Sequence, residues 1–315
     1  MRAEYCVVIP ALNSERFLGS ALASVARQSV TPVETVVVDD GSSDRTVPIA
    51  EAAGARVVSA TASRGPSAAR NLGVSRTSAP LIAFLDADDE WLPGHAAKLL
   101  DTFADAEVVF AGSNAEKFGS ELGVVGPGIS GDGVSDLRDL LITENPVIQS
   151  SAMLRRDVFR AVGGYDESIR LSEDYDLWTR VAEVGQFRTV NEVTIRRRMH
   201  SGQVSQRYRG DLVRAWWDVR RRTVARRLSR ASQFERVRVL QILEQAARLD
   251  VDWAIWTGDG AMLAIVREEM TATDEQLGLG TRLSAAGGLG QPALRLSQDV
   301  RCGSRSLLQF FQGQR

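Results

Sequence analysis

The sequence lacks the features by which several classes of protein are recognised. Its two cysteines, Cys6 and Cys302, lie near opposite ends of the 315-residue chain, so we expect no disulfide framework and favour a reducing compartment. No stretch approaches eighteen consecutive apolar residues, which argues against a membrane-spanning helix. The first four residues run directly into a short apolar segment, without the long apolar region that a secretory signal needs. These absences together predict a cytoplasmic protein.

Two nucleotide-binding signatures are also missing. No Gly-x-Gly-x-x-Gly follows the first apolar segment, and no Gly-Lys-Ser/Thr occurs in the chain, so a dinucleotide oxidoreductase or a P-loop protein would lack its central motif. The formal net charge of −2 gives no overall attraction to nucleic acid. With 44% hydrophobic and 25% charged residues, the composition is that of an ordinary globular protein. The length allows one large domain, or one domain with a smaller partner.

A cluster of carboxylates follows one apolar run. The run at 80–85 predicts a buried strand, and Asp86, Asp88 and Asp89 come directly after it. Neighbouring carboxylates resist joint ionisation, so a divalent cation with oxygen ligands that also bridges phosphates would suit them. The alternative is a capped turn, in which Asp89 or Glu90 begins the next helix. These residues alone leave both interpretations open.

Strands and helices alternate around this cluster. Apolar runs predict five strands, at residues 5–10, 36–38, 56–59, 80–85 and 107–111, with amphipathic helices between the first four. Short loops and this alternation predict a parallel, doubly wound sheet. In such a sheet the loops after the first, second and fourth strands meet at one edge. The polar residues of those loops should therefore lie together.

Further elements follow with a change of character. The segment 112–133 has seven glycines and is expected to be a loop or irregular hairpin. The expected α/β elements that follow are a helix at 135–142, a strand at 148–154, helices from 156 and from 173, and strand structure at 186–196. After these we expect only helices, at 212–230, 231–249 and 251–270, then a linker at 278–290 and a weakly ordered end. We therefore expect an α/β domain at 1–206 and a helical extension at 207–315.

The start of the helical extension is rich in arginine. Between residues 196 and 230 twelve arginines face only two acidic residues, and Trp216 and Trp217 lie among them. A basic helix of this kind, at about 208–230, fits peripheral contact with the inner face of a membrane. Packing of the two tryptophans against the first domain fits equally well. A dimer formed by the helical region is a further possibility.

Six short phrases, in order over about 200 residues, carry a resemblance. They are Val8–Asn13, Val38–Asp44, Gly65–Asn71, Phe84–Asp89, Gly163–Asp166 followed by Glu173-Asp174, and Arg198–His200. In these phrases the chain resembles the inverting family 2 glycosyltransferases of the GT-A fold. The resemblance implies a Rossmann-like, mostly parallel sheet with flanking helices, followed here by a helical region that it does not cover. Leu12 and Arg197 depart from it, since relatives often have an aromatic residue there.

The resemblance implies a metal-dependent transfer of a sugar, most simply from a UDP-sugar, to a hydroxyl of a polysaccharide, glycolipid or glycoconjugate. In the donor site, Asp40 would bind the nucleotide base, Arg70 would support the base or ribose, and Asp86 would bind the ribose. The further residues that would line this site are Pro10, Ala11, Asn13 and Ala87. A silent, GT-A-like nucleotide-sugar-binding or scaffolding protein is the alternative.

The remaining roles concern the metal and the acceptor. By resemblance, Asp88 and His200 would bind Mn²⁺ or Mg²⁺, and Asp174 would act as general base with Glu173 orienting the pocket. Trp91 would form the floor of the acceptor pocket. Each role has a plainer alternative: an Asx-turn for Asp40, a solvated helix residue for Arg70, acids at a helix N-terminus for Glu173 and Asp174, a packing residue for His200, and core for Trp91. His95, without a match, is expected on the surface.

Overall fold

The computed structural model describes residues 4–60, 62–127, 133–203 and 209–287. These residues form two compact units. The first contains the described residues up to 137 together with 147–200, and the second contains 138–146 and the described residues from 201 onward. The expected domain limit after residue 206 stays a prediction, but the short segment 138–146 groups with the helices and not with the sheet that flanks it in sequence. The linker expected at 278–290 is wrong in part, because residues 282–287 form a helix, and the expected weakly ordered end lies outside the described residues.

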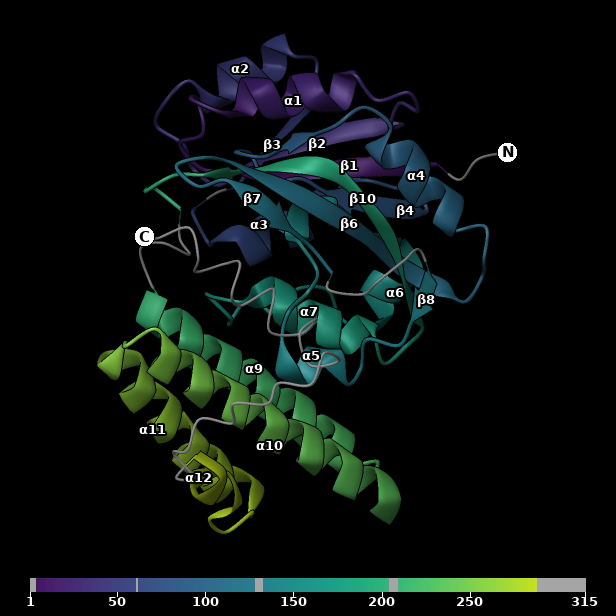
Figure 1. Ribbon diagram of the computed structural model, residues 1–315. Coiled ribbons are helices and arrows are strands. Elements are labelled where there is room, and N and C mark those ends of the chain that lie inside the picture. Colours follow the sequence, from purple (N-terminus) through teal and green to yellow (C-terminus); the bar gives the residue numbers. More distant parts are fainter. Residues whose placement is uncertain (1–3, 61, 128–132, 204–208, 288–315) are drawn as a thin grey trace. The chain divides into compact units, whose positions relative to one another are not determined.

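A single mixed sheet forms the centre of the first unit (Figure 1). Its strands are β1 (Tyr5–Ala11), β2 (Glu34–Asp39), β3 (Arg56–Ser59), β4 (Leu81–Phe84), β5 (Glu90–Trp91), β6 (Val108–Gly119), β7 (Gly123–Val125), β8 (Gly133–Ser135), β9 (Met153–Arg155) and β10 (Gln186–Met199). The spatial order is β3-β2-β1-β4-β9-β6-β10-β5, with β7 on β6 and β8 on β10. Strands β1 to β4 pair in parallel as predicted, but β9 runs antiparallel to both of its neighbours. The sheet is therefore mixed.

Helices cover both faces of the parallel part of the sheet. Figure 1 shows α1 and α2 on one side of β1–β3 and α3 on the other. The helices of this unit are α1 (Leu18–Ala26), α2 (Thr46–Ala52), α3 (Pro66–Ser75), α4 (His95–Thr102), α6 (Arg156–Ala161) and α7 (Glu173–Val181), with a 3-10 turn, η1 (Gln149–Ser151). Gly73 lets α3 approach the sheet closely, because a Cβ there would lie 2.4 Å from a methyl carbon of Val8.

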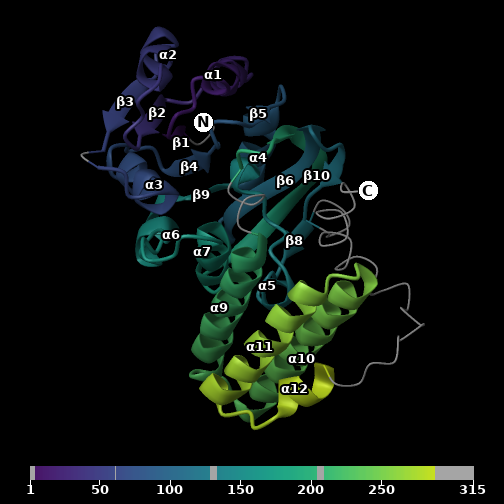
Figure 2. The ribbon, with the colours of Figure 1, turned by 90° about the vertical axis from the view of Figure 1, so that its left-hand side faces the viewer.

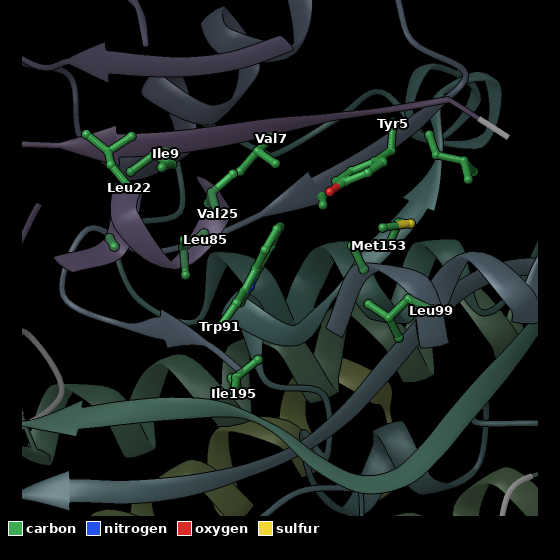
Figure 3. Close-up of a cluster of buried hydrophobic side chains, with 14 of the residues drawn as sticks. Tyr5, Val7, Ile9, Leu22, Val25, Leu85, Trp91, Leu99, Met153 and Ile195 are labelled. Atoms are coloured by element: carbon green, nitrogen blue, oxygen red, sulfur yellow. The ribbon is translucent and has the colours of Figure 1, made fainter. Parts of the chain in front are cut away.

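Trp91 belongs to the hydrophobic core. Figure 3 shows its ring among Val25, Leu85 and Ile195, and the residue is only 2% exposed. Its indole Nε1 donates a hydrogen bond to the carbonyl of Ser150 at 2.8 Å. The expectation that Trp91 forms the floor of an acceptor pocket is wrong, because a ring packed on both faces by protein has none left for a sugar.

His95 is likewise buried, against our expectation of a surface residue. It is 0% exposed, its Nδ1 lies 2.7 Å from the hydroxyl of Thr194, and its ring lies 4.5 Å from that of Trp91. Burial lowers the pKa of His95 to about 3, so the imidazole is neutral at physiological pH. The helix that begins here has Gly94 as its N-cap, so neither Asp89 nor Glu90 begins it.

Pairing between distant strands accounts for the other departures. Strand β6 continues to Gly119 because β10 pairs with it along that whole length, and β7 then folds back on it as a hairpin. The strand expected at 148–154 is the turn η1 followed by the short β9, and the helix expected at 135–142 shortens to α5 (Leu140–Thr143). Residues 128–132 lie outside the described part.

The second unit is built from helices that share an apolar core (Figure 2). They are α5, α9 (Arg209–Leu228), α10 (Gln233–Trp256), α11 (Gly260–Leu277) and α12 (Arg282–Gly287). Ser232 and Glu235 form a capping box at the start of α10. The break between α10 and α11 falls at Gly258, whose φ of 68° suits a helix end, and not near residue 250 as predicted. Among the described helices none is long and apolar enough to cross a membrane.

Trp216 and Trp217 pack inside the helical unit itself. Trp217 is 0% exposed and Trp216 packs against the same cluster, which includes Val251. Packing inside the helical unit accounts for the burial of Trp217. Contact of the basic helix with a membrane stays a prediction.

Candidate functional site

The loops after β1 and β2 are tied together by Asn13. Its φ of 48° places it in the left-handed region, its N–H donates to the Ser42 hydroxyl at 2.9 Å, and its side-chain oxygen accepts from the N–H of Ser43 at 2.9 Å. Pro10 and Ala11 lie just before it, at the end of β1, and the carbonyl of Ala11 accepts from the N–H of Asp40. The first two polar loops therefore meet, as the predicted parallel sheet requires.

Asp40 organises a third loop. It is 4% exposed, and its carboxylate accepts from the Ser63 hydroxyl and from the N–H groups of Arg64 and Gly65, all at 2.8–3.0 Å. The Asx-turn considered for Asp40 is made instead by Asp39, which accepts from Ser42 N–H at 3.0 Å. A carboxylate has about four acceptor positions, so Asp40 keeps capacity for one more donor.

Arg70 joins two acidic residues from distant parts of the chain. It lies in α3, is 4% exposed, and donates to Asp86 after β4 at 2.7 Å and to Glu173 at the start of α7 at 2.8 Å. Its guanidinium also lies over the Tyr165 ring, 5.3 Å from the centroid. It is therefore not the solvated helix residue of the plainer interpretation. A buried cation with two carboxylates fixes the separation of α7 from the end of β4.

Asp174 adjoins this bridge. Burial raises the pKa of the Asp174 carboxyl to about 7; neighbouring Glu173 adds to the shift and Arg70 opposes it. Asp86 also contributes, which places Asp174 within electrostatic range of the acidic cluster. The residue before this pair, Ser172, has φ of 63° and a buried hydroxyl without a hydrogen-bond partner. A carboxyl with a pKa near neutrality can take up and release a proton at physiological pH.

Asp88 and His200 meet although they are far apart in the sequence of the first unit. The Nε2 of His200, directly after β10, lies 3.1 Å from Oδ2 of Asp88, although the two are 112 residues apart. Among the described residues no group of three His, Cys, Asp or Glu side chains is placed to hold a metal ion by itself. Mg²⁺-type ions commonly take one or two protein carboxylates and complete their coordination with substrate phosphates and water. The pair therefore fits a cation that arrives with a diphosphate.

Comparison with known families decides the identity of the chain. The model described as "Glycosyl transferase family 2" matches residues 6–163, which is half of the sequence. The chain belongs to glycosyl transferase family 2. The predicted family is thereby confirmed.

Curated relatives of this glycosyltransferase agree. A succinoglycan biosynthesis protein, ExoU of Rhizobium meliloti, is 33% identical over 205 residues, which cover 58% of each chain. Chondroitin synthase of Escherichia coli is 25% identical over 205 residues, 63% of this chain and 29% of that protein. The chain thus spans well under two thirds of the length of these relatives.

Solved structures confirm the GT-A fold. Residues 1–349 of S. aureus TarS superpose with a TM-score of 0.67 at 18% identity, covering 99% of this chain and 92% of that fragment. The mannosyltransferase PcManGT of Pyrobaculum calidifontis, solved with GDP-Man and Mn²⁺, superposes with a TM-score of 0.57 at 15% identity, covering 98% and 85%. At such identities the likeness concerns the fold.

Sequence reasoning missed Ser150, which supports the acidic loop. Ser150, in η1, donates its hydroxyl proton to Asp89 at 2.6 Å and accepts from the N–H of Asp86 at 3.2 Å. Asp89 is 4% exposed, and burial, followed by the charges of Asp88 and Asp86, raises its pKa well above the ordinary range. Asp89 was expected in the acidic cluster or in a capped turn, and no spacing in the sequence marks Ser150. Ala87, between the acids, is buried.

Proposed function

We propose that this family 2 glycosyltransferase moves a sugar from a nucleoside diphosphate sugar, with a UDP-sugar as the favoured donor, to an acceptor hydroxyl with inversion at the anomeric carbon. The observation that carries the proposal is the buried Arg70, which joins Asp86 on the donor side to Glu173 beside Asp174. Arg70 thus links Asp86, proposed to bind the ribose, to the Glu173-Asp174 pair, proposed to act on the acceptor.

The donor site is proposed at the joined loops after β1 and β2. Asp40 would accept a hydrogen bond from the nucleotide base, with Pro10, Ala11 and Asn13 lining the same place, and Asp86 and Ala87 would meet the ribose. The structures of TarS with UDP-GlcNAc and of PcManGT with GDP-Man support a nucleoside diphosphate sugar as the class of donor. We favour UDP among the nucleotides.

Asp88 and His200 are the residues that would hold Mn²⁺ or Mg²⁺. When bound, such an ion would neutralise charge on the departing diphosphate. Without the ion, Oδ2 of Asp88, in the loop after β4, and Nε2 of His200, directly after β10, already lie 3.1 Å apart. The Mn²⁺ in the PcManGT complex supports this choice of cofactor.

Asp174 would be the general base. It would take the proton of the acceptor hydroxyl as that oxygen attacks the anomeric carbon, while the bond from that carbon to the diphosphate breaks. A single displacement of this kind inverts the configuration. Glu173, already bonded to Arg70, would orient the site. ExoU and chondroitin synthase, by their names, support an acceptor in polysaccharide synthesis.

The alternative is a silent protein that binds nucleotide sugars without transferring them. A carboxyl with pKa of about 7 at the start of α7 favours the enzyme, because a binding protein has no use for a base tuned to neutral pH.

Nucleotide release from UDP-sugars, with Mn²⁺ and with EDTA, tests the proposal. We expect metal-dependent release in the native protein. Asp174→Asn should bind UDP yet release nucleotide roughly 10²–10⁴-fold more slowly, and Asp88→Ala should lose the Mn²⁺-dependent rise in melting temperature that UDP gives. A native protein that binds UDP-sugars but releases nothing with any acceptor glycan would favour the silent alternative.

A further inference from the structure

Arg198 contacts three consecutive residues of the acidic loop. Its backbone N–H donates to the carboxylate of Asp89 at 2.8 Å, its Nε donates to the carbonyl of Asp88 at 3.0 Å, and its terminal nitrogen donates to Glu90 at 2.7 Å. One residue of β10 therefore holds the main chain and two side chains of the segment that carries Asp88.

Two aromatic rings fix the guanidinium group in place. The Cζ of Arg198 lies 4.7 Å from the centroid of the Phe17 ring and 4.3 Å from that of Phe118. The Phe17 ring also lies 4.9 Å from the ring of His200. Planar guanidinium groups stack on aromatic faces, so the arginine plane and the imidazole share one aromatic support.

These contacts bear on the separation of Asp88 and His200. Three carboxylates in four residues repel one another, and without a cation the loop gains by spreading apart. Arg198 opposes that spreading through the Asp88 carbonyl and Glu90, and it stands two residues before His200 on the same strand. The distance between the two proposed ligands is therefore set by a group that is not itself a ligand.

We propose that Arg198 is a positioning residue that holds Asp88 and His200 ready for a divalent cation bound with the donor diphosphate. The proposal rests on the proposed function. It assigns Arg198 a role in the affinity for the ion and none in direct contact with the sugar.

Arg196 offers a matched control on the same strand. Its guanidinium lies 4.1 Å from the Phe118 ring centroid, and it pairs with Glu90 at 3.4 Å and with Glu116 at 3.6 Å. It thus shares the strand face, the ring and one acidic partner with Arg198, while its described contacts do not include the Asp88 carbonyl. Replacing it removes the same charge without releasing the loop.

The experiment measures Mn²⁺ binding by the full chain, as free Mn²⁺ in electron paramagnetic resonance titrations at a fixed concentration of UDP. Arg198→Met should weaken Mn²⁺ binding by about tenfold or more, the range for groups that orient metal ligands. Arg198→Lys should recover part of this loss, because an ammonium can pair with Glu90 but cannot stack as a plane. Arg196→Met should stay within about twofold of the native value, as expected for an exposed ion pair.

Further measurements separate the possible failures. UDP affinity without metal should be unchanged in Arg198→Met, and Phe118→Leu, which removes one ring and keeps both charges, should give an intermediate loss if Arg198→Met does not fold. Native-like Mn²⁺ affinity in Arg198→Met, or an equal loss in Arg196→Met, would overturn the positioning role and leave the proposed function standing. A native protein that binds UDP but no Mn²⁺ would overturn the proposed metal site, and the inference with it.

Discussion

Among the proposed catalytic groups, the Asp174 carboxyl has a pKa far from that of the free amino acid. Its pKa of about 7 results first from burial and then from the charge of Glu173. The ordinary value is near 3.9. The acid is thus half protonated near neutral pH, and both activity and stability should respond to pH through it.

The activity response has a definite sign. A general base must be unprotonated, so kcat/KM should rise as the pH passes upward through about 7 and level off above it. Asp174→Asn should lower kcat by roughly 10²–10⁴-fold. Initial rates of nucleotide release between pH 5.5 and 8.5 provide the measurement. A flat profile across that range, with a normal rate at pH 6, would contradict the role of Asp174.

The free energy of unfolding should change with pH in the opposite direction to the activity. Because the folded pKa lies above the unfolded one, the stabilising proton is fully present below about pH 4 and is lost as the pH rises through about 7. Asp174→Asn, which cannot ionise, should therefore melt at a higher temperature than the native protein at pH 8, and this difference should be smaller at pH 5. Thermal melts without ligand at both pH values measure this. An equal difference at the two pH values would mean that Asp174 does not titrate between them.

The sequence motifs predict which polar residues come together better than they predict how the core is packed. Asp88 and His200 were predicted to share a site because the motif fixes their types and order, and the fold brings them within 3.1 Å. Trp91, His95 and Ser150 were misjudged or missed, because an aromatic, an imidazole or a hydroxyl has the same identity in a core and at a surface. Only the packing of β10 and η1 around them decides between the two.

At the scale of elements, local patterns predicted the first half of the sheet better than the second. Strands β1 to β4 pair with neighbours supplied by adjacent βα units, so apolar periodicity was sufficient to place them. The length of β6 and the direction of β9 depend on partners in other parts of the chain. No local window of sequence contains that information.

The turn η1 supports the acidic loop through Ser150, and its loss should be measurable. Ser150→Ala would remove the hydroxyl that donates to Oδ2 of the buried Asp89 and accepts from the Asp86 N–H, while Oδ1 of Asp89 would keep the Arg198 N–H. We expect about 1–3 kcal/mol of destabilisation in urea denaturation, together with weaker Mn²⁺-dependent binding of UDP.

The neighbouring serine provides the control. Ser151 is equally buried, but its hydroxyl donates to the Ile148 carbonyl, away from the acids. Ser151→Ala should lower stability without changing nucleotide affinity. If both variants bind UDP and Mn²⁺ as the native protein does, Ser150 has a purely structural role.

At the scale of the whole molecule, the helical unit depends on one buried ion pair. Arg220, 2% exposed, bonds to Asp250 in α10 and to the carbonyl of Thr143 in the segment 138–146. Asp250→Ala would leave the arginine charge uncompensated, at an expected cost of about 3–5 kcal/mol. Guanidinium denaturation followed by tryptophan fluorescence, to which Trp217 beside Arg220 contributes, measures this.

An exposed pair in the same unit gives the comparison. Glu268 pairs with Arg214 at 2.9 Å, and both side chains are largely open to solvent. Glu268→Ala should cost less than about 1 kcal/mol. A similar cost for the two variants would show that the Arg220 pair is not the buried support it is described to be.

Segment 138–146 belongs to the helical unit, and this matters for the design of truncated or chimeric proteins. Within the described residues the chain crosses between its two units three times, after residues 137, 146 and 200, so the C-terminal helices cannot be exchanged as a separate piece. A fragment that stops near residue 206 would expose Ile142, which lies in the helical core of the full chain. It would also lack Arg220, which donates a hydrogen bond to the Thr143 carbonyl. Chimeras that exchange the helices between relatives should carry the 138–146 insert with them.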